Sequence, residues 1–319
     1  MRSSIRLTKN SRRFGVAAAV LGGVALAGWP VSALANVVPP TLLTAANYAA
    51  IAGTGITNSP GTGTVINGAA AVYPASATAV TGFPPGTYTS LDAASGSGSA
   101  ANALQAQTDL TAAYTEAANA TPFTNLTGTD LGSLTLGPGV YRFTSNAQLT
   151  GTLTLDGDGQ TNPTFIFQME AELTTATAAS VAFINGANAC ALYWQVTSEA
   201  TLGSSTTFQG NLMAQAGITM GSDASIGVGG GVDGGRALVS TVGLLSMDTA
   251  NVIDEPTGGC VYAASTTTPL TGPPSTLTPD TGAFGFTPGG VPLDVVGLLL
   301  LSTGVLATRT GLRVRRNRA

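Results

Sequence analysis

The chain has 319 residues, of which 44% are hydrophobic and 9% charged, with 42 glycines and only 10 phenylalanines. This composition predicts a core of small side chains stacked in layers, and a solenoid fits it better than a compact α/β domain. Ten of the 12 basic residues lie near the two ends, so Arg142 and Arg236 alone stand against the 15 carboxylates found from Asp92 to Asp280. Such a surface repels phosphate, which excludes nucleic acid as a partner.

Residues 1–35 are typical of a secretory signal peptide. A basic start is followed by an apolar stretch from Val16 to Trp29 and by Ala33-Leu34-Ala35, which fits an A-x-A cleavage site. A first transmembrane helix is the weaker interpretation because the apolar stretch is short. We therefore expect an exported protein whose folded domain spans residues 36–262.

One helix is expected, from about residue 99 to residue 118. The segment before it is rich in Gly, Pro and Thr and predicts one or two edge strands and tight turns. The helical segment is rich in alanine, and Ala103, Leu110, Ala113 and Ala117 recur at spacings of three and four residues. A single helix placed before many strands is expected to lie along one face of them and to bury its apolar stripe.

Residues 131–251 predict many short strands, because apolar residues alternate there with Thr, Ser, Gly or Gln. An internal repeat, in which an apolar residue is followed by small polar ones, begins at Leu173, Leu202, Met220 and Met247, at intervals of 29, 18 and 27 residues. The two longer intervals contain extra pieces, residues 185–191 and 227–235. Removing about 9 to 11 residues for each returns 18, the length of one coil of a three-sided β-solenoid.

Eight segments together resemble the ice-binding protein family found in cold-adapted bacteria, fungi and algae, known as the DUF3494 domain. They are IAGTGITN (51–58), VTGFPPGT (80–87), DLTAAY (109–114), DLGSLTLGPGVY (130–141), FIFQ (165–168), WQV (194–196), ATLG (200–203) and GRAL (235–238). The match spans about residues 42–260, and residues 65–74 depart from the family pattern. The resemblance implies an all-β fold with one long helix, a right-handed three-sided β-helix with the α-helix packed along one face. It also implies adsorption to ice, so the expected partner is the surface of an ice crystal.

A solenoid face repeats its side chains about every 4.7 Å from coil to coil, which makes it a regular grid. Threonine suits such a grid because its β-branch restricts χ1 and little entropy is lost on binding. Eight residues of the repeat are therefore predicted to bind ice: Thr175, Thr177, Ser204, Thr207, Ser222, Ser225, Thr249 and Asn251. Asp223 and Asp248 beside them lower the expected activity. Without the resemblance, the β-propensity of threonine explains the same pattern.

Two other functions stay open on the sequence alone. One is a surface adhesin or glycan-binding solenoid, and the other is a polysaccharide-active enzyme that uses Glu170 and Glu172, two residues apart on one strand face. The chain contains no histidine, which removes the commonest general base and metal ligand. We expect no catalytic residue, no metal, no cofactor and a monomer.

The cysteines and the C-terminal region point to the outside of a cell. Cys190 and Cys260 are expected to form a disulfide, with two buried thiols as the alternative. A Pro/Thr/Ser linker (263–276) leads to residues 277–319, where an LTPDTG segment, an apolar stretch and a basic tail resemble a sortase sorting signal. The residues of the signal are Pro279, Asp280, Thr281 and Gly282, and Thr278 stands where the usual form has leucine. Anchorage to the cell wall, or to the membrane by the apolar stretch, is expected.

Overall fold

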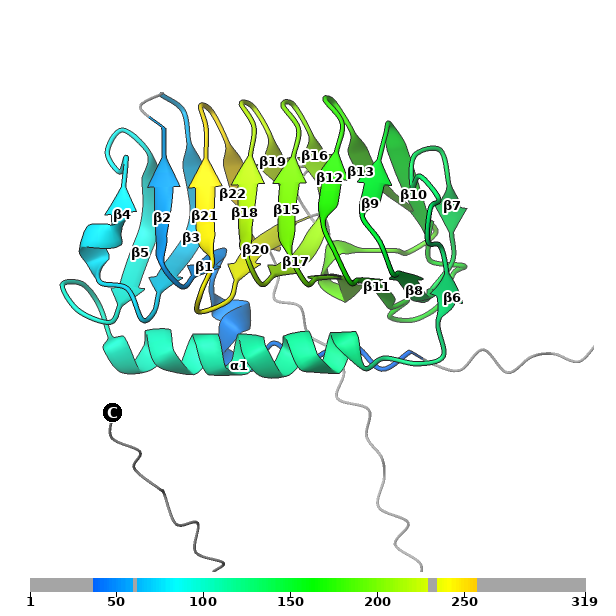
Figure 1. Ribbon diagram of the computed structural model, residues 1–319, viewed down its shortest axis with the longest axis horizontal. Coiled ribbons are helices and arrows are strands. Elements are labelled where there is room, and N and C mark those ends of the chain that lie inside the picture. Colours follow the sequence, from blue (N-terminus) through cyan, green and yellow to red (C-terminus); the bar gives the residue numbers. More distant parts are fainter. Residues whose placement is uncertain (1–36, 60–61, 229–233, 257–319) are drawn as a thin grey trace, which may run out of the picture. The chain divides into compact units, whose positions relative to one another are not determined.

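The computed structural model describes residues 37–59, 62–228 and 234–256. Within them the strands wind into coils, and every strand pairing is parallel. Strands of the inner coils pair with the coils on both sides, and those of the end coils on one side. Three faces result, here called A, B and C. Figure 1 shows face B toward the viewer, with its strands parallel and in one row. The predicted β-solenoid is confirmed.

Face A is the face that the helix covers. Its strands, in spatial order, are β6 (Thr124–Asn125), β8 (Gly139–Phe143), β11 (Phe165–Met169), β14 (Leu192–Val196), β17 (Gly210–Ala214), β20 (Gly235–Val239), β1 (Ala50–Ala52), β3 (Val65–Val72) and β5 (Thr87–Ala93).

Face B contains β9 (Ala147–Leu149), β12 (Leu173–Thr175), β15 (Glu199–Leu202), β18 (Gly217–Met220), β21 (Leu244–Met247), β2 (Gly55–Asn58) and β4 (Val80–Thr81). Face C contains β7 (Thr135–Leu136), β10 (Thr152–Asp156), β13 (Ser180–Ile184), β16 (Thr207–Phe208), β19 (Ser225–Ile226) and β22 (Val252–Asp254). Strand β3 turns the corner from face C to face A, because its first residues pair with β22 and its last ones with β1.

The first and last coils of the described chain lie side by side. Strand β1 lies between β20 and β3, and β2 lies between β21 and β4. The chain then passes through β5 into helix α1 (Ala100–Ala118), which runs along the solenoid, and returns coil by coil from β6 to β22 (Figure 1). The two extra pieces of the repeat fall between a face C strand and the next face A strand, and the first of them contains the short helix η3 (Ala189–Ala191).

Helix α1 is fixed at both ends. Ser99 caps its start by accepting a hydrogen bond from the backbone N–H of Asn102 (3.2 Å). The Asp92 carboxylate accepts hydrogen bonds from the Ser99 amide and the Tyr48 hydroxyl, both at 2.6 Å. At the other end, Gln168 Nε2 donates to the carbonyl of Ala117 (2.8 Å). The helix predicted at residues 99–118 is therefore confirmed.

The apolar stripe of α1 covers face A. Its members are Ala103, Ala106, Leu110, Ala113 and Ala117, and they pack on the outward residues Ile51, Val140, Ile166, Tyr193, Met213 and Leu238. The short helix η1 (Leu43–Asn47) packs beside α1, where Thr44 donates to the Asp109 carboxylate. The residues of face A that lie under the helix are thereby removed from solvent.

Aromatic rings fill one side of the interior. Tyr141, Phe167 and Trp194 occupy the same position in three consecutive coils, with ring centroids 5.2 and 4.2 Å apart. Phe208 of face C adds a tilted contact with Trp194 at 4.8 Å. The remaining layers consist mostly of Leu, Ile, Val, Met and Ala, as the composition predicts.

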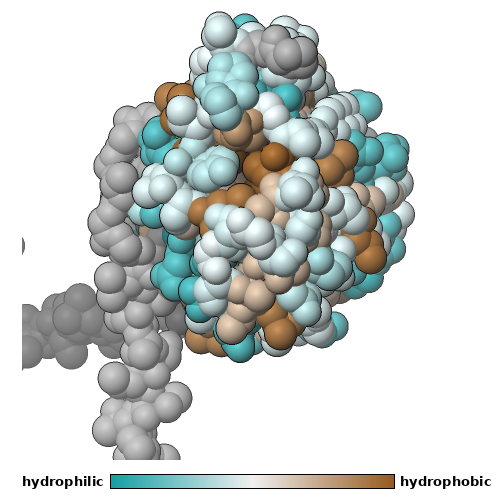
Figure 2. Space-filling model, turned by 90° about the vertical axis from the view of Figure 1, so that its left-hand side faces the viewer, coloured by the Kyte–Doolittle hydropathy of each residue, from teal (hydrophilic) through white to brown (hydrophobic). Residues whose placement is uncertain are grey.

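Partly buried apolar residues close the end of the solenoid at β4 and β5. They include Ala77 of the short helix η2 (Ala77–Ala79) and the rings of Phe83 and Tyr88, whose centroids are 5.5 Å apart. Figure 2 shows this end, with apolar residues between polar ones. Within the described ranges, no helix is long and apolar enough to cross a membrane.

Candidate functional site

Face B carries a column of small hydroxyl side chains. On the strands from β9 to β2 one residue points outward between buried neighbours, and the register aligns these residues with one another and with Thr81 of β4. In spatial order the column is Gln148, Thr174, Thr201, Thr219, Ser246, Thr57 and Thr81. All seven side chains are exposed or partly exposed. Parallel pairing spaces them about 4.8 Å apart, so six consecutive coils present a hydroxyl at the same height.

Most of these hydroxyls are free to bind water. Among the described residues, those of Thr57, Thr81, Thr174, Thr201 and Ser246 make no hydrogen bond to the protein. The exception is Thr219, which donates to the Glu199 carboxylate at 2.6 Å. Because χ1 of threonine is restricted, the methyl and hydroxyl groups of the column hold fixed positions. The column is therefore a preformed surface on which ordered water can rest.

The residues flanking this column are small over part of the face. Toward face A, the register aligns Glu199, Gly217, Leu244 and Gly55. Glu172 precedes Leu173 as Glu199 precedes Ala200, so the two glutamates occupy equivalent positions on adjacent coils. Toward face C, the residues after the strands include Ala176, Gly203, Gly221 and Asp248. The face is thus flat at its glycines and carries charge at Glu172, Glu199 and Asp248.

Asp248 remains ionised at neutral pH. The Ser222 hydroxyl donates to its Oδ2 at 2.7 Å, and this bond, with that from the Thr249 backbone, lowers the pKa of Asp248 below its ordinary value. These partners hold its carboxylate at the corner between faces B and C, beside the hydroxyl column.

The eight residues predicted to bind ice do not share a face, and this prediction is wrong in its geometry. Thr177, Ser204, Ser222 and Thr249 lie in the turns between faces B and C. Each precedes a residue with positive φ (Ala178, Ser205, Asp223 and Ala250, φ 58° to 60°), so they are equivalent positions of one repeated turn. Thr207 and Ser225 are aligned on face C, where Ser225 is only 8% exposed.

Thr175 and Asn251 point inward. Thr175 is 3% exposed, and its Oγ1 accepts from the Gly203 amide (2.9 Å) and bonds the Thr206 hydroxyl (2.8 Å). Asn251 is fully buried, and its Nδ2 donates to the carbonyls of Gly221 (2.6 Å) and Ala224 (3.0 Å). Both side chains hold corner turns together.

The error lies in where the count begins: Thr175 is one residue past Thr174 of the column, and Ser204, Ser222 and Thr249 are three residues past Thr201, Thr219 and Ser246. Side chains alternate between the two sides of a sheet, so counting two residues on from an inward apolar residue never reaches the outward column. The missed signal is the hydroxyl that directly precedes the apolar residue: Thr201 before Leu202, Thr219 before Met220 and Ser246 before Met247. Thr57 and Thr81 lie before the repeat begins and carried no such signal.

The two glutamates of the enzyme hypothesis do not share a strand. Strand β11 ends at Met169 and β12 begins at Leu173, so Glu170 and Glu172 lie on the bend between faces A and B. Glu170 forms a salt bridge with Arg142, whereas Glu172 lies within reach of Asn146 Nδ2 at 3.4 Å. The expectation of a carboxylate pair on one strand face is wrong.

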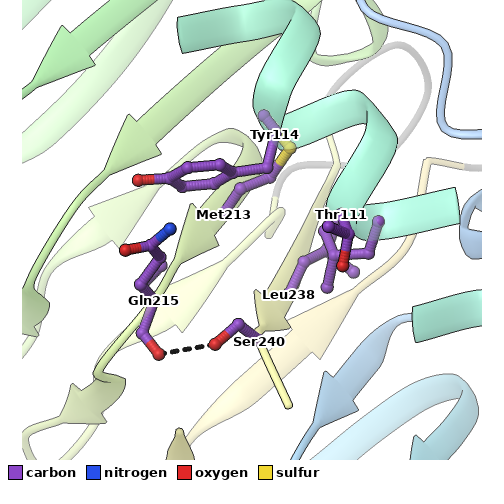
Figure 3. Close-up of a pocket in the computed structure, with 8 residues that line it drawn as sticks. Thr111, Tyr114, Met213, Gln215, Leu238 and Ser240 are labelled. Carbon is purple, nitrogen blue, oxygen red and sulfur yellow. Dashed lines mark hydrogen bonds between the residues drawn. The ribbon is translucent and has the colours of Figure 1, made fainter. Parts of the chain in front are cut away.

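A shallow pocket between α1 and face A offers no reactive group. Thr111 and Tyr114 of the helix lie over Met213 and Leu238 of the sheet, and the Ser240 hydroxyl donates to the Gln215 carbonyl at 2.7 Å (Figure 3). Its lining contains no charged side chain, and its one titratable group, the Tyr114 hydroxyl, is hydrogen-bonded to Thr197 and Gln195. We assign it no function.

Several predicted features lie outside the described residues: the signal peptide (1–35), the linker (263–276), the sorting signal with Pro279, Asp280, Thr281 and Gly282, and Cys260. Cys190 takes part in a disulfide. Its pairing with Cys260 stays a prediction.

Proteins of known family resemble this chain in sequence. Residues 50–253 match the family described as Ice-binding-like. The chain is 39% identical over 251 residues to an ice-binding protein of Nostoc sp. (strain HG1), covering 77% of this chain and 84% of that protein. An ice-binding protein of Flavobacterium frigoris (strain PS1) is 33% identical over 216 residues, 65% of this chain and 74% of its own.

Solved structures show the same fold. The crystal structure of an ice-binding protein from an Antarctic biological consortium aligns with a TM-score of 0.59 at 34% identity, covering 67% of this chain and 90% of that one. The DUF3494 domain of Shewanella frigidimarina ice-binding protein 1 aligns with a TM-score of 0.60 at 27% identity, covering 69% and 99%. The chain belongs to the ice-binding-like family.

Proposed function

We propose that this protein adsorbs to ice through face B and thereby inhibits ice growth and recrystallisation or attaches the cell to ice. The observation that carries the proposal is the column of six aligned hydroxyls from Thr174 to Thr81, on a face that no other described element covers. Ice carries no charge to pair with, so recognition must come from many small groups held in register. The relatives named as ice-binding proteins support this function.

Face B suits this task better than the other two faces. Face A is covered by α1. The aligned positions on face C are Thr152, Ser180, Thr207, Ser225, Val252, Val65 and Thr87, so the hydroxyls there are interrupted by two valines. Adsorption neither forms nor breaks a covalent bond, and we propose that the protein is not an enzyme.

The test is adsorption of the purified protein to ice, together with the rate of ice recrystallisation. We expect the protein to be enriched in ice and to slow recrystallisation. Thr57→Tyr, which places a ring on face B, should reduce both effects about tenfold or more, whereas the matched face C variant Thr207→Tyr should retain them. A wild-type protein that is excluded from ice, or a loss confined to Thr207→Tyr, contradicts the proposal.

We further propose that the protein is exported and displayed on the cell surface as a monomer. The signal-peptide pattern of residues 1–35 and the LTPDTG segment, apolar stretch and basic tail of residues 277–319 support this location. Expression in a host with and without sortase, followed by fractionation, separates wall attachment from membrane retention. Recovery of the protein in the cytoplasm contradicts export.

A further inference from the structure

The two halves of face B differ in charge. On one half, Glu172, directly before β12, and Glu199, the first residue of β15, flank the hydroxyl column. On the other half, the equivalent positions of β18, β21 and β2 are Gly217, Leu244 and Gly55. The boundary falls between β15 and β18, where Glu199 aligns with Gly217. We call these the acidic half and the neutral half.

The acidic half is a poor surface for a crystal of water. A carboxylate binds its own hydration shell strongly, and moving it to a surface without a counter-charge costs much free energy. Glu172 and Glu199 have no basic partner among the described residues, whereas Glu170 pairs with Arg142. A glutamate side chain is also longer than threonine, so it rises above the plane of the hydroxyls.

The neutral half combines hydroxyls with small and apolar groups. Thr219, Ser246, Thr57 and Thr81 stand beside two glycines, which leave the floor of the face low. Leu244 is 38% exposed on this half, and Val242, in the turn just before β21, is 73% exposed. Exposed apolar groups of this kind lose contact with liquid water at little cost, because they bind no water themselves.

Asp248 is the one carboxylate of the neutral half. The Ser222 hydroxyl from the neighbouring coil and the Thr249 hydroxyl both donate to it, at 2.7 and 3.4 Å. Its charge is therefore directed to the corner with face C and away from Leu244, which lies on the opposite side of the column.

We infer that contact with ice is confined to the neutral half of face B, from β18 to β4, and that Glu172 and Glu199 set the limit of the contact area. This inference rests on the proposed function. Thr219 lies at the boundary, because its hydroxyl donates to Glu199 rather than to water. The hydroxyls of Thr174 and Thr201 belong to the same column but are kept from ice by the two carboxylates beside them.

The experiment compares two tyrosine variants within the hydroxyl column, and two variants that replace carboxylates by amides. Thr57→Tyr and Thr174→Tyr place one ring on the neutral and on the acidic half, and neither hydroxyl has a protein partner to lose. The double variant Glu172→Gln/Glu199→Gln removes the two charges while keeping side-chain size. Asp223→Asn is the charge control, because Asp223 lies in a corner turn at φ 60°, a conformation that asparagine adopts readily. Thermal unfolding of each variant checks the fold.

Ice adsorption and recrystallisation should fall about tenfold in Thr57→Tyr and less than twofold in Thr174→Tyr. The double amide variant should adsorb at least about threefold more strongly than wild type. The control Asp223→Asn should adsorb as wild type does. Equal losses in the two tyrosine variants, or no gain in the double amide variant, would overturn the inference while wild-type binding still supports the proposed function. Absence of wild-type binding would overturn both.

Discussion

Thr57 and Ser246, 189 residues apart in sequence, are aligned neighbours in the hydroxyl column of face B. The first coil of the domain thereby joins β4 to the strands β9 to β21 of face B, which come from later in the chain. Strands β1 and β2 pair with β20 and β21 on one side and with β3 and β4 on the other. The neutral half of face B therefore depends on closure between the first and last coils.

That closure requires glycine at residue 53. A Cβ there would lie 2.1 Å from the backbone carbonyl carbon of Thr241, which belongs to the turn of the last coil. Since backbone cannot move aside as a side chain can, Gly53→Ala should lower the free energy of unfolding by about 1 to 3 kcal/mol. Chemical denaturation measures the change. Ice adsorption should fall with it, and an unchanged unfolding midpoint contradicts the close approach.

Stability should decrease below about pH 4, in part through Asp92. Burial acts to raise the pKa of this carboxyl, but hydrogen bonds from Tyr48, the Ser99 amide and Asn102 outweigh burial and lower the pKa below its ordinary value. A carboxyl whose pKa is lower in the folded state stabilises the fold above its unfolded-state pKa, and this stabilisation is lost as pH falls through the folded value.

Unfolding free energy measured against pH tests this linkage. Asp92→Asn should make the acid limb shallower, because the amide does not titrate. Asp254→Asn serves as a control, since Asp254 lies on face C, away from the helix end. An equally steep acid limb in Asp92→Asn would contradict the assignment.

The stack of rings in the interior should carry much of the stability. Phe167 lies between Tyr141 and Trp194 and is fully buried, so Phe167→Ala leaves a cavity and should cost about 3 to 5 kcal/mol. Phe123, which is 44% exposed and lies against Arg142 at 4.8 Å, provides the matched control. Phe123→Ala should cost about 1 kcal/mol or less. Similar losses in the two variants would contradict the proposed core.

The helix and the coil length were predictable because their signals are local. The apolar spacing of Ala103, Leu110 and Ala113 fixed the helix and its buried side, and the 18 residues from Leu202 to Met220 correspond to one coil. The same alignment extends to Met247. It fails at Leu173, which aligns with Ala200 rather than Leu202.

The hydroxyl face was not predictable in the same way. The hydroxyls before Leu202, Met220 and Met247 carried a local signal, but Thr174 and Thr175 are identical neighbours, and nothing local shows which of them faces water. Thr57 and Thr81 join the column through pairing with a coil far away in sequence, which no spacing within their own segment reveals. The helix, which covers face A, then leaves faces B and C as the candidates for contact with ice.

Asn251 separates a structural role from an ice-binding one. The sequence pattern places it among the ice-binding residues, but it is fully buried and donates from Nδ2 to the carbonyls of Gly221 and Ala224. Asn251→Ala leaves these carbonyls without that donor and should cost about 1 to 3 kcal/mol of unfolding free energy. At a temperature where the variant is folded, its adsorption to ice should equal that of wild type.

Thr57→Tyr should show the opposite pattern, since its outward position leaves the interior unchanged. Its unfolding free energy should stay within about 0.5 kcal/mol of wild type while adsorption to ice is lost. Denaturation curves and ice adsorption measured on the same preparations give both quantities. If the folded Asn251→Ala variant also lost ice binding, the corner between faces B and C would be part of the contact, and confinement of the ice contact to the outward column would be refuted.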